Sequence, residues 1–130
     1  MKFDTKDLNP GAWFTFPGKG NEGKVCLRVC DIDVLDEIQK QTRTKGVEYK
    51  KGQRFEFHDD NPILERALTY DYCIMDWKNI NDAEGKPIPC NYDMKKFLMG
   101  KSVKFSSFVA DCLTKLSEDE AASKVVREKN

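Results

Sequence analysis

The hydrophobic pattern of the sequence changes halfway along the chain, and this change limits the possible folds more than any other feature. Before residue 61, short β-prone runs at residues 13–16 and 25–30 are separated by turn-forming residues. After residue 61, apolar residues recur at the spacing of amphipathic helices. We therefore expect a single α+β domain over residues 1–116, with a small antiparallel sheet from the N-terminal half packed against a C-terminal helical bundle.

Two hairpins and one short helix are expected in the first half. The Gly-rich loop 17–23 joins the first two strands, and because a strand follows it, the loop lacks the helix that a phosphate-binding fingerprint requires. Residues 31–40 begin with acidic residues and suit a short helix. The basic segment 42–54 leads into strand-like alternation at 55–57, which favours a second hairpin.

Helix start signals follow one another in the second half. Asn61 and Pro62 predict the start of a helix that extends through Met75, and the turn-rich stretch 79–89 comes after it. Two further helices are expected, one from Asn91 to a stop at Gly100 and one from Ser102 through residue 116. A capping-box pattern at 117–120 predicts that the tail 117–130 is a separate helix or frayed.

The charge balance and the cysteines narrow the class of protein. The chain has 22 basic and 22 acidic residues, which argues against sequence-independent binding to a phosphate backbone. No apolar stretch is long enough to cross a membrane, and residues 1–7 lack the apolar run of a signal peptide, so we expect a cytoplasmic protein. Five scattered cysteines are typical of reduced thiols packed as small apolar side chains.

Catalytic and metal-binding patterns are weak. The single histidine, His58, precedes two aspartates at an expected turn, and nothing in the sequence orients it toward a cysteine nucleophile. Cys26 and Cys30 are four residues apart, whereas structural zinc sites have closely paired ligands such as C-x2-C. We therefore expect no enzyme, no metal and no cofactor, and an enzyme centred on His58 is the least favoured alternative.

A family resemblance covers about half of the chain. It extends from about Asn61 to Asn130 and includes a helix that runs into Asp76-Trp77-Lys78-Asn79-Ile80, the turn 82–90, a short helix that starts at Asn91, a Phe-rich helix and an end at Glu128-Lys129-Asn130. In this order these features resemble the tail assembly chaperones of long-tailed bacteriophages and prophages. The strand-like first half departs from a purely helical member of that family.

The resemblance implies a non-enzymatic protein of the bacterial host cytoplasm that binds the helical tape measure protein and recruits tail tube subunits. Self-association is also expected. Trp77 would anchor the turn onto the helical bundle, and the partner helices would contact the apolar faces that carry Phe97, Phe105, Phe108 and Val109.

The basic hairpin suggests a different class of function. Basic residues surround Tyr49 and Phe55, and this combination is typical of grooves that bind single-stranded nucleic acid. The alternative function is thus a small nucleic-acid-binding accessory protein, against the simpler interpretation of a solvated hairpin whose lysines protect its edges. Its binding should be salt-sensitive and lost when Lys45, Lys50 and Lys51 become Glu. The residues concerned are Arg43, Lys45, Lys50, Lys51 and Arg54.

Overall fold

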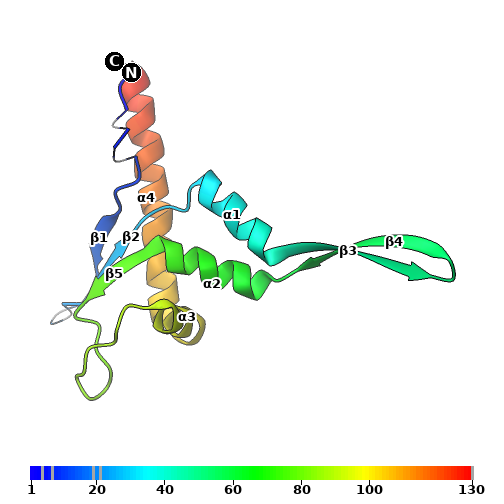
Figure 1. Cartoon of the computed structure of the whole chain (residues 1–130). Helices are drawn as coiled ribbons and strands as arrows, with labels where there is room; N and C mark the ends of the chain where they lie inside the picture. Colours follow the sequence, from blue (N-terminus) through cyan, green and yellow to red (C-terminus); the bar gives the residue numbers. More distant parts are fainter. Residues whose placement is uncertain (4, 7, 19, 21, 130) are drawn as a thin grey trace. The chain divides into compact units, whose positions relative to one another are not determined.

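The computed structural model describes residues 1–3, 5–6, 8–18, 20 and 22–129, with side chains described as far as residue 119. It is an α+β structure, as the sequence predicts. Two compact units are present: Met1–Val29 with Tyr70–Asn130 form the first, and Cys30–Thr69 form the second. The predicted domain over residues 1–116 thus contains the whole second unit and the first unit up to residue 116. The elements, drawn in Figure 1, are β1 (Ala12–Thr15), β2 (Lys24–Leu27), α1 (Ile32–Thr42), β3 (Arg43–Lys50), β4 (Gln53–Asp60), α2 (Pro62–Cys73), β5 (Ile74–Lys78), α3 (Tyr92–Lys101) and α4 (Val103–Lys129).

The first unit contains a three-stranded antiparallel sheet in the order β1-β2-β5. The sequence predicts that residues 74 and 75 continue the preceding helix, and this is wrong, because α2 ends at Cys73 and β5 begins at Ile74. Within β5, Ile74 and Trp77 are buried, and Trp77 is the register partner of Val25. Pairing with β2 and burial against the core therefore override the local helical pattern.

The core of the first unit lies between this sheet and α4. Two aromatic contacts define it: the rings of Phe16 and Phe108 stack with centroids 4.1 Å apart, and the rings of Trp77 and Phe105 meet edge to face at 5.8 Å. Apolar side chains of the sheet thus face those of the helix. The buried cluster consists of Phe16, Val25, Leu27, Ile74, Trp77, Phe105, Val109 and Cys112.

Helix α4 is longer than the sequence predicts. It runs without interruption from Val103 to Lys129, so no new helix begins at Ser117. Ser117 and the acidic residues after it can lie inside a helix, and no Gly or Pro interrupts residues 103–129. Helix α3 similarly continues through Gly100 to Lys101. The capping side chain at Ser102 confirms the predicted start, because its Oγ accepts a hydrogen bond from the Phe105 amide at 3.1 Å.

The second unit consists of α1, the hairpin β3-β4 and the first part of α2. The Asp31 carboxylate accepts a hydrogen bond from the Val34 amide at 3.0 Å and caps α1. At the tip of the hairpin, Lys51 and Gly52 both have positive φ angles, of 52° and 77°, as two-residue hairpin turns require. At its base, the Asn61 amide donates to the Thr42 carbonyl at 2.8 Å. The predicted second hairpin is therefore confirmed.

No helix in the described part of the chain has the length and apolar character needed to cross a membrane.

Candidate functional site

The structure separates the five predicted partner-binding residues into core and surface. Trp77, Phe105 and Val109 are buried in the first unit. Phe108 is partly buried, and its ring stacks on Phe16. Phe97 on α3 remains 55% exposed. A partner helix that approaches this unit can therefore contact Phe97 and the exposed part of Phe108, whereas the other three side chains stabilise the fold.

Trp77 connects the turn 79–89 to the core through a hydrogen bond and ring packing. Its indole Nε1 donates a hydrogen bond to the carbonyl of Ile88 at 2.7 Å, and its ring packs against Phe105. Within the turn, the Asp82 carboxylate accepts hydrogen bonds from the amides of Glu84 and Lys86, both at 2.9 Å. A buried indole that has a polar partner satisfies its donor without contact to water. The position of Trp77 is therefore structural in this unit.

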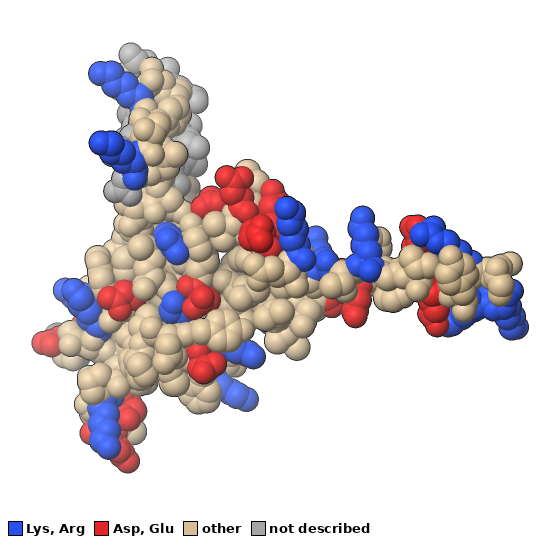
Figure 2. Space-filling model, in the orientation of Figure 1, with Lys and Arg blue, Asp and Glu red and all other residues tan. Residues whose placement is uncertain are grey.

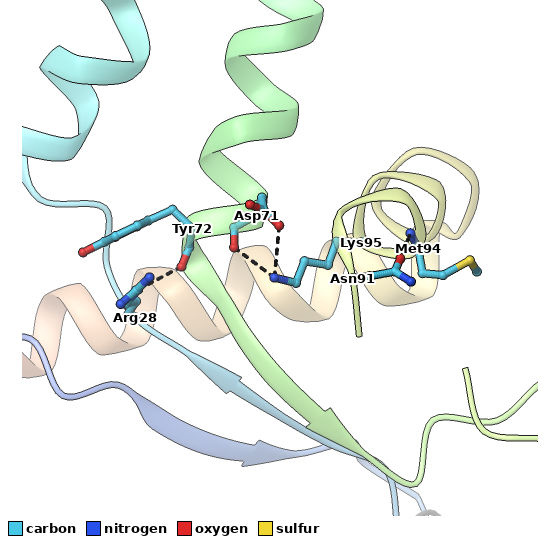
Figure 3. Close-up of polar contacts among 6 residues, drawn as sticks. All are labelled: Arg28, Asp71, Tyr72, Asn91, Met94 and Lys95. Carbon is cyan, nitrogen blue, oxygen red and sulfur yellow. Dashed lines mark hydrogen bonds and ion pairs between the residues drawn. The ribbon is translucent and has the colours of Figure 1, made fainter. Parts of the chain in front are cut away.

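Two cations hold the last turn of α2, as Figure 3 shows. The Lys95 ammonium lies 3.1 Å from both the backbone carbonyl and a carboxylate oxygen of Asp71. The Arg28 Nε donates to the Tyr72 carbonyl at 2.9 Å, and its guanidinium lies 3.7 Å from the centre of the Tyr72 ring. Cations at a helix C-terminus satisfy its free carbonyls and interact favourably with the helix dipole.

Sequence reasoning missed this cluster. Lys95 is buried although its residue type is rarely found inside a protein. The sequence offers one signal for its burial. Lys95 precedes Leu98 by three residues and Met99 by four, so it shares a face of α3 with these apolar side chains. The partners come from segments far apart in sequence, so spacing alone could not identify them.

The basic residues of the hairpin β3-β4 are exposed, but three of the five face acidic partners. Arg43 lies 3.4 Å from Glu65, and Arg54 lies 2.8 Å from Glu56. Lys50 lies 3.8 Å from Glu48. Residues 43–60 contain five Lys and Arg against four Asp and Glu, and Figure 2 shows both signs of charge side by side along the hairpin.

This mixture weakens the electrostatic attraction to a phosphate backbone. Among the described side chains, Lys45 and Lys51 form no ion pair. The structure thus brings the five basic residues onto one hairpin without forming a uniformly positive surface. Nucleic-acid binding by this hairpin stays a prediction.

The hairpin β3-β4, hereafter the hairpin arm (residues 43–60), also exposes large apolar side chains. The side chains of Val47, Tyr49, Phe55 and Phe57 are 46–69% exposed. Every residue of β4 is exposed, and only Gly46 of β3 is partly buried. Phe57 lies across from Gly46, and a Cβ atom at residue 46 would overlap its ring. The sequence predicts the hairpin but not the exposure of both its faces.

The titratable groups whose side chains the structure describes do not form a recognisable catalytic set. His58 is exposed on β4 opposite Lys45, and the described residues contain no group of three His, Cys, Asp or Glu side chains that could hold a metal ion. Burial raises the pKa of the Cys26, Cys90 and Cys112 thiols, which keeps them protonated at neutral pH. Protonated thiols are poor nucleophiles.

Comparisons of the chain with known protein families, with curated proteins and with solved structures find no match. The function of the chain is therefore inferred from its own residues and surfaces.

Proposed function

We propose that this protein is a non-enzymatic phage or prophage tail assembly protein that acts as a chaperone in the bacterial cytoplasm. It binds apolar helices of the tape measure protein and recruits tail tube subunits. The proposal is supported by the order of features from Asp76 to the Phe-rich helix, which resembles that of tail assembly chaperones.

The exposure of Phe97 is the structural observation that supports the proposal. Phe97 lies on α3 with 55% of its surface in solvent, while Phe105 on the next helix is buried. A large aromatic side chain gains hydrophobic free energy when a partner covers it, and such residues are enriched among interface hot spots. Val103, at the start of α4, is also exposed. Each of the two side chains offers an apolar contact to a partner helix.

The charges near this corner indicate which helices it would favour. Three exposed lysines, Lys96, Lys101 and Lys104, and one exposed aspartate, Asp93, lie within seven residues of Phe97 in the sequence, so the local charge is basic. A partner helix with acidic residues beside its apolar face would complement them.

The test is a mild affinity purification of the tagged protein, co-expressed with its neighbouring genes, followed by mass spectrometry of the proteins that co-purify. We expect a long helical tail protein with the wild type and its loss with Phe97→Ser. Tyr49→Ser is the control, because it removes an aromatic ring from the hairpin arm that is at least as exposed as Phe97 (69% against 55%). Recovery of the tail protein with Phe97→Ser would reject this surface. Failure to recover any tail protein with the wild type would reject the proposed function.

A further inference from the structure

The outer edge of β4 has no neighbouring strand among the described residues, because the second sheet contains only β3 and β4. Eight residues long and without proline, this edge lacks two of the usual protections against pairing with another chain. It also lies beside exposed aromatic side chains. A free edge of this kind is a template for an additional strand.

The hydrogen bond at the base of the hairpin arm shows which residues of β4 can pair outward. The Asn61 amide donates to the Thr42 carbonyl, so residues 61 and 42 direct their backbone groups toward each other. Along an antiparallel pair, the backbone N–H and C=O groups of successive residues point alternately toward the partner strand and away from it. The residues whose backbone groups point outward, away from β3, are therefore Arg54, Glu56, His58 and Asp60.

The charges along this outward set run from positive to negative. Arg54 lies near the tip of the hairpin arm, opposite Tyr49, and Asp60 lies at its base, opposite Arg43. When two copies of β4 pair antiparallel about a two-fold axis at Phe57, Arg54 of each copy faces Asp60 of the other. Glu56 of each copy then faces His58 of the other. The opposite charges of Arg54 and Asp60 on directly facing residues stabilise the paired strands.

Neighbouring registers of the same pairing are unfavourable. An axis at Glu56 places the two Glu56 side chains opposite each other, and an axis at His58 places Glu56 opposite Asp60. The outward residues of β3 are Arg43, Lys45, Val47 and Tyr49, which include no acidic side chain. Two β3 edges would therefore bring basic side chains together. An axis at Phe55 also places opposite charges face to face, Arg54 and Glu56, but it pairs only residues 53–57 of β4, whereas the axis at Phe57 pairs residues 54–60. The charge pattern and the length of the overlap together favour the axis at Phe57.

We propose that a second copy of this chain docks on β4, so that two hairpin arms form a four-stranded antiparallel sheet with its two-fold axis at Phe57. The contact is isologous and closes on itself, as most homodimer interfaces do. On one face of this sheet, Phe55 and Phe57 of both copies lie in a continuous row, which reduces the exposure of four aromatic rings. This inference does not depend on the proposed function, because it involves the hairpin arm and not Phe97.

The first test is a charge exchange measured by sedimentation equilibrium of the full chain over a wide range of concentration. We expect a monomer–dimer equilibrium for the wild type and a dimer about tenfold weaker for Arg54→Glu or Asp60→Lys, since two facing pairs become repulsive. The double variant Arg54→Glu/Asp60→Lys should recover the dimer. If residues 54 and 60 stabilised only the hairpin arm of their own copy, the double variant would instead dimerise more weakly than either single variant. In the double variant, the new carboxylate at residue 54 would lie beside Glu56, and the new ammonium at residue 60 would lie opposite Arg43.

The second test traps the register with a disulfide. Phe57→Cys places two thiols at the two-fold axis, with Cα atoms about 4.5 Å apart, within the range that a disulfide spans. Phe55→Cys is the matched control, because residues 55 of the two copies would lie about 14 Å apart. After oxidation with glutathione disulfide, we expect a 57–57 crosslink and no 55–55 crosslink in the digested protein.

Three results would overturn the proposal. A wild type that stays monomeric at all concentrations shows that β4 does not pair. Equal dimerisation of the wild type and both single charge variants places the contact elsewhere. Crosslinks at residue 55 as readily as at residue 57 show random encounter and not a defined register.

Discussion

The two antiparallel sheets of this protein, β1-β2-β5 and β3-β4, are stabilised in different ways. The first contributes Val25, Leu27 and Ile74 to a core that α4 covers. The second has both faces in solvent, and its register depends on a two-residue turn and on cross-strand pairs. An isolated two-stranded hairpin is only marginally stable in water. The comparison shows that equally regular strands can differ greatly in how much apolar surface they bury. The hairpin arm is the sheet whose apolar side chains remain exposed.

The largest expected difference between the two sheets comes from removing one aromatic ring from each. Trp77→Ala should lower the free energy of unfolding by about 3–5 kcal/mol, because it leaves a cavity in the core and an unpaired Ile88 carbonyl. Tyr49→Ala should lower it by less than about 1 kcal/mol, because the ring is exposed. Urea unfolding followed by circular dichroism measures both. Equal losses would show that the hairpin arm is buried against something that the described contacts do not include.

A smaller effect is expected from the cation that binds the last turn of α2 within the first unit. Lys95→Met should lower the free energy of unfolding by about 2 kcal/mol, because it removes two hydrogen bonds and leaves the Asp71 carboxylate without its partner. Lys96→Met is the control, since Lys96 is exposed on the same helix. The same urea titration distinguishes them. A loss no larger than that of Lys96→Met would mean that the apolar core alone positions α2.

A still smaller effect than that of Lys95→Met is expected at the tip of the hairpin arm. Gly52→Ala should destabilise the hairpin by about 1 kcal/mol, because a Cβ atom is strained at a φ of 77°. Amide hydrogen exchange should then be about fivefold faster in β3 and β4 and unchanged in β2.

Gly100→Ala provides a matched glycine in the first unit. Gly100 lies in α3 with open space where a Cβ would be, so this substitution should stabilise the protein by about 0.5–1 kcal/mol. If Gly52→Ala also made amide exchange faster in β2, the prediction that the substitution destabilises only the hairpin arm would be wrong.

Local signals in the sequence predict the starts of four helices, whereas the fifth predicted start, at Ser117, lies inside α4. Asp31, Asn61, Asn91 and Ser102 each accept a hydrogen bond from an amide three residues later. A cap forms between residues that are close in sequence, so residue type and spacing are sufficient to predict it. The turn at residues 51 and 52 is equally local.

The candidate surfaces could be predicted only in part. Phe97 and Phe105 both follow helical spacing, but one is exposed and the other buried. An amphipathic pattern marks a face of a helix without stating whether the core or a partner covers it. For the same reason, the aromatic residues of the hairpin arm could be predicted as strand residues but not as exposed ones.

The sequence by itself determined the α+β class, the helix caps and the two hairpins, because each depends on interactions between residues close along the chain. Only the tertiary structure decided that residues 74–78 form a strand, that Lys95 reaches Asp71 and that Phe97 remains in solvent. These features depend on which distant segments pack together, and a side chain's burial is set by those neighbours and not by its own type.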